Sequence, residues 1–196
     1  PVIVSDVSHI PVNKEVFILI LGRGDTIPVI SHDNPHMIPP DMTYTRGRIS
    51  FIDALQSPER ILSFINEKKP DFIGGYGGTL ANLALCARHQ NISVHHPRLI
   101  GFSGEGLSSR SVRIIEDVFK SPVMTSYVST ETGMIGAEHR YGEGYRVFFW
   151  DVVVEIINDS GNPVGPDETG SVVVTTFHNT VTPLIRYSGL DDLARF

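Results

Sequence analysis

The strongest constraint on the fold is a unit of strand, turn and helix that recurs along the first two thirds of the chain. Short apolar segments predict strands at residues 16–21, 48–53, 71–73, 98–102 and 122–124. Between strands, apolar residues repeat at helical spacing, as in Leu80, Leu83, Ala84 and Ala87. Strands that alternate with helices usually form a mainly parallel sheet with the helices packed on it. The pattern therefore predicts an α/β fold.

The expected helices begin at residues suited to capping. Ser57 followed by Pro58 suits the start of the first helix, and Pro70 ends it. Thr79 is the expected cap of the second helix, after a glycine-rich turn at 74–78. Either Ser108 or Ser109 caps the third. The proline-rich segment 25–47 is expected to be a long surface loop.

The pattern changes after about residue 145. Apolar runs at 151–157 and 171–176 predict two strands, and the segment 158–163 between them is a strong turn signal. An antiparallel hairpin or small barrel-like sheet is expected here. We place a boundary near 140–146. This divides the chain into a partial α/β subdomain, 1–140, and an antiparallel β subdomain, 141–196.

Composition excludes several classes of function. The chain has 196 residues, a net charge of −6 and 41% hydrophobic residues, which is typical of a globular protein without a basic nucleic-acid-binding face. The single cysteine, Cys86, rules out an internal disulfide and a cysteine-rich metal site. No apolar run reaches the length of a membrane span, and no signal peptide pattern occurs, so a cytoplasmic location is expected.

Three polar turns follow expected strands, and each contains a glycine or lies just before one. They are Gly74–Gly78, Ser103–Glu105 and Tyr127–Glu131. Ligands of open parallel sheets bind beyond the carboxyl ends of the strands, so three such turns at one edge favour a pocket. An aromatic ring, two hydroxyls and a carboxylate in the third turn suit a nucleotide with a divalent cation. Read alone, each turn is also compatible with a tight turn at a polar surface.

These segments resemble the adenylate-forming superfamily. Tyr127–Glu131 is similar to its Tyr-Gly-x-Thr-Glu motif, and Ser103–Leu107 to the preceding Gly-Glu-x-Leu turn. Pro183–Tyr187 with a following aspartate resembles the Arg-Tyr-x-x-x-Asp segment of the phenylacetate–CoA ligase and CapK-like branch. The stretch from Gly161–Val164 to Glu168–Gly170 is similar to the hairpin connection of that branch. Order and spacing agree from about residue 50 to 196.

The resemblance implies a nucleotide site. Tyr127 would stack on adenine, with Val128 and Ser129 beside the nucleotide, Thr130 would contact the α-phosphate of ATP, and Glu131 would bind Mg²⁺. Thr130 and Glu131 are therefore the implied catalytic residues.

Further nucleotide contacts are implied before and after this motif. Ser103, Gly104 and Glu105 would border the adenine pocket. Either Asp191 or Asp192 would hold the ribose hydroxyls. Counting forward from the Arg-Tyr pair selects Asp191 and counting back from the C-terminus selects Asp192; we prefer Asp191.

The implied reaction joins a carboxylic acid to coenzyme A through an acyl-adenylate, with ATP consumed and AMP formed. Tyr76, Gly77 and Gly78 would line the pocket for the acid, which the branch suggests is aryl. The expected partners are therefore small molecules, with no nucleic acid and no membrane, and a homodimer is left open.

The chain also departs from the family pattern. Val128 replaces the usual glycine, and neither the upstream phosphate loop nor the domain with the catalytic lysine is found in the sequence. We therefore expect a piece of a large N-terminal domain that is inactive by itself. Two alternatives stay open: a non-catalytic nucleotide-binding or assembly module, and a synthetase that passes the acyl group to another acceptor.

Overall fold

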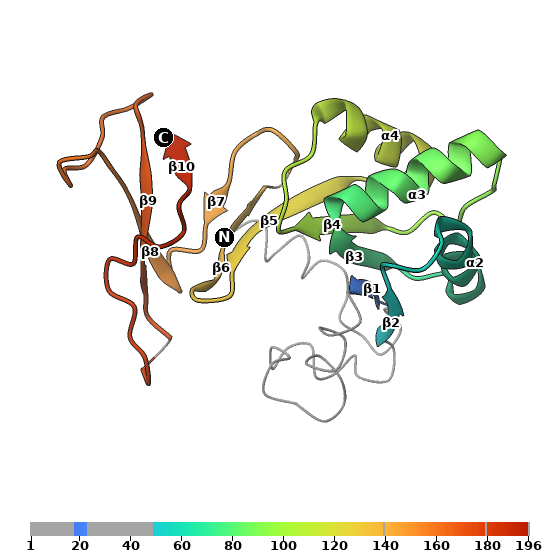
Figure 1. Ribbon diagram of the computed structural model, residues 1–196, viewed down its shortest axis with the longest axis horizontal. Helices are drawn as coiled ribbons and strands as arrows, with labels where there is room; N and C mark the ends of the chain where they lie inside the picture. The colour runs from blue at the N-terminus through green and yellow to red at the C-terminus, as the bar shows by residue number, and fades with distance from the viewer. Residues whose placement is uncertain (1–17, 23–48, 139, 179, 196) are drawn as a thin grey trace. The chain divides into compact units, whose positions relative to one another are not determined.

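The computed structural model describes residues 18–22, 49–138, 140–178 and 180–195 (Figure 1). The described residues form two compact units. The first contains the residues up to Thr125 together with 138–144, and the second contains 126–137 and the residues from Tyr145 onward. The loop expected at 25–47 lies outside the described residues, as do the first two residues of the strand expected at 16–21.

The first unit is built on parallel strands, as the sequence pattern predicts. The strands are β1 (Ile18–Gly22), β2 (Ile49–Asp53), β3 (Phe72–Tyr76), β4 (Leu99–Ser103) and the beginning of β5 (Val123–Ser129). Their order is β2-β1-β3-β4-β5. Strand β1 pairs in parallel with β2 and β3, and β3 pairs in parallel with β4. Because the strands are parallel, the turns that follow β3 and β4 emerge at the same edge of the sheet.

Three helices accompany these strands: α2 (Pro58–Lys68), α3 (Gly77–Gln90) and α4 (Ser109–Phe119). The apolar face predicted for α3 is buried, and α3 packs against both α2 and α4 (Figure 1). Ser57 and Ser108 cap α2 and α4 by accepting bonds from the N–H groups of Arg60 and Ser111. None of the helices in the described ranges has the length and apolarity that a membrane span requires.

The start of α3 differs from the prediction. Gly74 and Gly75 belong to β3, and α3 begins directly at Gly77, so the turn expected at 74–78 and the cap expected at Thr79 are wrong. The N-cap residue is Tyr76, which makes no side-chain capping bond. A distant residue replaces the local cap, because the Gly78 N–H donates to Glu105 Oε1 at 2.7 Å. Local capping rules do not detect a partner 27 residues away.

The second unit is antiparallel, which confirms the prediction for the later part of the chain. Strand β6 (Gly133–Glu138) pairs with β7 (Arg146–Val147). Strands β8 (Val152–Ile157), β9 (Thr169–Thr176) and β10 (Leu193–Arg195) form a separate sheet in the order β10-β9-β8. Ile135, Val152, Val172 and Val174 form the buried core of this unit. The fold is therefore α/β with a small antiparallel sheet.

Two turns of the second unit are formed by short polar side chains. Asn158 Oδ1 accepts from the N–H groups of Ser160 and Asn162, which builds the turn expected at 158–163. The turn after β5 spans Thr130–Thr132 and leads into β6, a strand that the sequence analysis did not predict. Gly133 opens β6 with a φ of 70°, a conformation that favours glycine.

Candidate functional site

The predicted acid-binding residues lie where β3 ends and α3 begins. Tyr76 is the last residue of β3, and Gly77 and Gly78 are the first two of α3. A Cβ on Gly77 would lie 2.8 Å from Leu107 Cγ, so glycine allows the β4–α4 connection to approach the helix closely. Gly78 is exposed, which leaves this turn of the helix accessible.

Glu105 joins the two predicted turns of the first unit. Ser103 ends β4 beside Tyr76 of β3. Gly104 then adopts a φ of 79°, which turns the chain so that Glu105 reaches the beginning of α3. The start of a helix carries partial positive charge, and the carboxylate of Glu105 bonded to the Gly78 N–H complements it.

A cavity of ≈ 270 Å³ opens at this edge of the first unit. It includes three of the residues predicted from the sequence, Tyr76, Gly78 and Glu105. The remaining lining residues come from the β2–α2 connection, α2 and α3: Ala54, Gln56, Pro58, Ile61, Thr79, Asn82 and Leu83. The cavity is large enough for a small organic acid, and among the described residues that line it none is basic.

Tyr127 and Asp192 meet in the second unit. The Tyr127 hydroxyl donates to Asp192 Oδ2 at 2.5 Å, although the two residues are 65 positions apart in the sequence. Burial, with a further contribution from the Asp192 carboxylate, raises the pKa of the Tyr127 phenol above its usual range. The Tyr145 ring lies 5.7 Å from the Tyr127 ring, centre to centre. Of the two candidate aspartates, it is therefore Asp192 that bonds to the predicted adenine-stacking residue, Tyr127.

The turn that follows β5 presents two of the predicted residues outward. The Ser129 and Thr132 hydroxyls lie 2.9 Å apart, and the Thr132 N–H donates to Ser129 Oγ at 3.0 Å. Thr132 is fully buried, whereas Thr130 and Glu131 between them are exposed. Ser129 and Thr132 thus hold the turn, which leaves the Thr130 hydroxyl and the Glu131 carboxylate facing solvent. Val128, in place of the usual glycine, has 40% of its surface exposed.

One buried carboxylate, at the end of β6, was not predicted from the sequence. Glu138 is 7% exposed and accepts from the N–H groups of Gly142 and Gly144, at 3.0 and 3.1 Å. Tyr141 lies in the sequence between the end of β6 and these glycines, and its hydroxyl donates to the Leu107 carbonyl. The only sequence signal was an acidic residue ahead of two glycines spaced two apart, a pattern too common to single out.

Searches by sequence give no relatives: no protein-family model matches the chain, and no curated protein does. Solved structures share its fold. A 2-hydroxyisobutyryl-CoA ligase with 2-HIB-AMP and CoA matches 93% of this chain with a TM-score of 0.69 and 19% identity. The anthranilate CoA ligase AuaEII with anthranoyl-AMP matches 84%, with a TM-score of 0.62 and 16% identity. A luciferase-like enzyme from the nonluminescent Zophobas morio mealworm matches 81%, with a TM-score of 0.60 and 16% identity.

The chain spans 44%, 32% and 38% of the lengths of these three proteins. At such identities the likeness shows the fold alone, which this chain shares with these two CoA ligases. Two of the three, the 2-hydroxyisobutyryl-CoA ligase and AuaEII, are in complex with an acyl-AMP.

Proposed function

We propose that this chain is part of an AMP-forming acid–thiol ligase that activates a carboxylic acid as an acyl-adenylate. The observation that carries the proposal is the Tyr127–Asp192 hydrogen bond. It joins a residue of the Tyr-x-x-Thr-Glu segment to a residue that follows the Arg-Tyr segment. The resemblance assigned these two segments to the adenine and the ribose of one nucleotide. The order of the motifs favours the phenylacetate–CoA ligase and CapK-like branch.

The nucleotide would be held mainly by the second unit. Tyr127 offers a ring for stacking on adenine. We assign the ribose hydroxyls to Asp192 rather than Asp191, because Asp192 lies beside that ring. Carboxylates that follow a strand hold ribose hydroxyls in other nucleotide-binding folds.

Thr130 and Glu131 suit the phosphates and a magnesium ion. Both are exposed at the tip of a turn that Ser129 and Thr132 fasten from inside. The described residues contain no group of three acidic, His or Cys side chains able to hold a metal unaided. Mg²⁺ in nucleotide sites typically takes one or two carboxylates plus substrate phosphates, which Glu131 fits. The ion would neutralise phosphate charge there.

The acid would occupy the cavity of the first unit, against Tyr76, Gly77 and Gly78. Its carboxylate attacks the α-phosphorus of ATP, the bond to the β-phosphate oxygen breaks, and pyrophosphate leaves. A thiol, proposed to be that of coenzyme A, then attacks the acyl carbonyl and releases AMP. The chain's own contribution is to position the reactants and stabilise charge.

Calorimetric titration of the chain with AMP, and with ATP plus Mg²⁺, tests the proposal. We expect saturable, weak binding that Tyr127→Ala abolishes. Tyr127→Phe keeps the stacking ring and should retain most of the affinity. Phe177→Ala removes another exposed aromatic ring of the second unit and should change nothing. Two outcomes would contradict the proposal. One is nucleotide binding that survives Tyr127→Ala. The other is that neither the chain nor a longer chain with its neighbouring segments binds nucleotide at millimolar concentration.

A further inference from the structure

The segment between β9 and β10 runs beside β9 without being a regular strand. The N–H groups of Thr176, Val174 and Val172 donate to the carbonyls of Leu184, Tyr187 and Asp192, at 3.0, 2.9 and 3.0 Å. The Tyr187 N–H also donates back to the Val174 carbonyl at 2.8 Å. The carbonyl of Asp192 is thus fixed to β9, while its carboxylate meets the Tyr127 hydroxyl.

The spacing of these bonds shows where the segment departs from a strand. The first two donors, Thr176 and Val174, are two positions apart on β9, but their acceptors, Leu184 and Tyr187, are three positions apart. One extra residue is therefore accommodated, as in a β-bulge. Arg186 lies in this bulge with a φ of 52°, a left-handed conformation in which arginine is uncommon. Such a residue persists only where its surroundings hold it in place.

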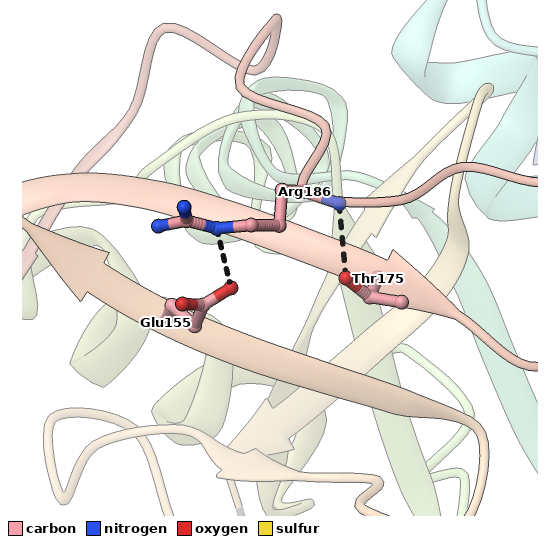
Figure 2. Close-up of polar contacts among 3 residues, drawn as sticks. All are labelled: Glu155, Thr175 and Arg186. Atoms are coloured by element: carbon pink, nitrogen blue, oxygen red, sulfur yellow. Dashed lines mark hydrogen bonds and ion pairs between the residues drawn. The ribbon is translucent and has the colours of Figure 1, made fainter. Parts of the chain in front are cut away.

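Two polar contacts hold Arg186 in that conformation (Figure 2). Its backbone N–H donates to Thr175 Oγ1 on β9 at 2.9 Å. Its side-chain Nε donates to Glu155 Oε2 on β8 at 3.1 Å. Arg186 thereby fastens the bulge to β9 through its backbone and to β8 through its side chain. The side chains of Arg186 and Glu155 are 53% and 31% exposed, so the ion pair between them is partly screened by water.

We propose that Arg186 is a positioning residue for Asp192, and that its contacts with Glu155 and Thr175 determine where the aspartate meets Tyr127. Arg186 lies six residues before Asp192 and acts through the backbone that joins them. Between them the chain turns tightly: a Cβ on Gly189 would lie 2.6 Å from the Tyr187 hydroxyl, and Asp191 has a φ of 53°. A shift of the bulge is therefore passed on to Asp192. The consequence for ligand binding rests on the proposed nucleotide site.

The test compares Arg186→Asn, Glu155→Gln and the double variant with the unchanged chain. Asparagine tolerates the left-handed conformation, so this variant keeps the backbone and removes the side-chain bond to Glu155. Arg146→Ala on β7 removes another exposed arginine of the same unit and serves as the matched control. Thermal unfolding of every variant separates a local effect from a loss of folding.

The first readout is the ionisation of Tyr127, followed by NMR of ¹³C-labelled tyrosine and assigned with Tyr127→Phe. At about pH 11, above the ordinary tyrosine pKa of about 10, Tyr127 of the unchanged chain should remain protonated. In Arg186→Asn the pKa of Tyr127 should fall part of the way toward that ordinary value, because burial of the ring remains while the contribution of Asp192 is lost. Glu155→Gln should act in the same direction, and the double variant should add little to either single change.

The second readout is AMP affinity, which we expect to fall about fivefold in Arg186→Asn and not at all in Arg146→Ala. If the unchanged chain does not bind AMP, the proposed function fails, but the Tyr127 readout still tests the positioning. An unaltered Tyr127 pKa in a folded Arg186→Asn protein would overturn the inference. So would effects of the two single changes that simply add in the double variant.

Discussion

The two units hold their candidate site residues in different ways. In the first, a carboxylate from one turn, Glu105, bonds to a backbone N–H at the start of the neighbouring helix, at Gly78. Gly78 and Glu105 follow β3 and β4, two adjacent parallel strands, so sheet topology alone brings them close. In the second, the Tyr127–Asp192 contact joins two side chains, and Asp192 comes from an irregular segment fastened to β9. We infer that the first geometry depends on the sheet, whereas the second depends on individual side chains.

The largest loss of stability should come from adding a side chain at a crowded glycine of β9, the central strand of the three-stranded sheet. A Cβ on Gly170 of β9 would lie 2.5 Å from the Ile157 carbonyl oxygen. This is a backbone atom of the paired strand β8, so it cannot move without disturbing the sheet. Gly170→Ala should therefore lower the free energy of unfolding by about 3 kcal/mol. Chemical denaturation measures this. Gly106→Ala, where a Cβ meets nothing within 4 Å, is the control and should change little.

A smaller loss is expected from the buried carboxylate of the first unit. Glu138→Ala leaves the Gly142 and Gly144 N–H groups without their acceptor, which should cost about 2 kcal/mol. Urea denaturation measures the loss, and Glu143→Ala, at an exposed neighbouring position, is the control. Equal stability of the two variants would mean that water replaces the carboxylate without cost.

The carboxylate at the start of α3 should matter less, because it is exposed. Glu105→Ala removes the acceptor of the Gly78 N–H, a change similar to the loss of a helix cap, so we expect a loss of about 1 kcal/mol in the free energy of unfolding. Tyr127 ionisation should be unaffected, because the Glu105–Gly78 contact lies within the first unit and the Tyr127–Asp192 contact within the second. Thermal unfolding and tyrosine NMR together check the prediction. A shifted Tyr127 pKa in Glu105→Ala would break the comparison.

The weakest effect should be a pH dependence specific to the second unit. The pKa of Tyr127 is raised in the folded protein, so folding favours its protonated form. The resulting stability is fully present below the unfolded pKa of about 10 and is lost as pH rises from there toward the folded value. The urea midpoint should therefore fall more steeply above about pH 10 in the unchanged chain than in Tyr127→Phe. Identical slopes would show that burial and Asp192 together do not raise the pKa of Tyr127 in the folded protein.

Local patterns predicted much of the fold. The helical spacing of Leu80, Leu83, Ala84 and Ala87 identified the buried face of α3, and Ser57 and Ser108 cap the helices they were expected to cap. These features depend on residues three or four positions apart, which sequence patterns report directly. The glycines at 74–78 misled for the same reason. Glycine is typical of turns, but here two of them continue β3 and two begin α3.

The sequence by itself determined the alternation of strands and helices, the change to an antiparallel sheet and the chemical types at the candidate site. Each of these follows from spacing and side-chain chemistry within a short window. Only the tertiary structure decided that Glu105 replaces a local cap on α3, and that Asp192 rather than Asp191 meets Tyr127. Those contacts span 27 and 65 residues. The Glu105 contact depends on the pairing of β3 with β4, and we infer that the Asp192 contact depends on the bulge at Arg186. Neither feature is encoded in the residues that make the contact.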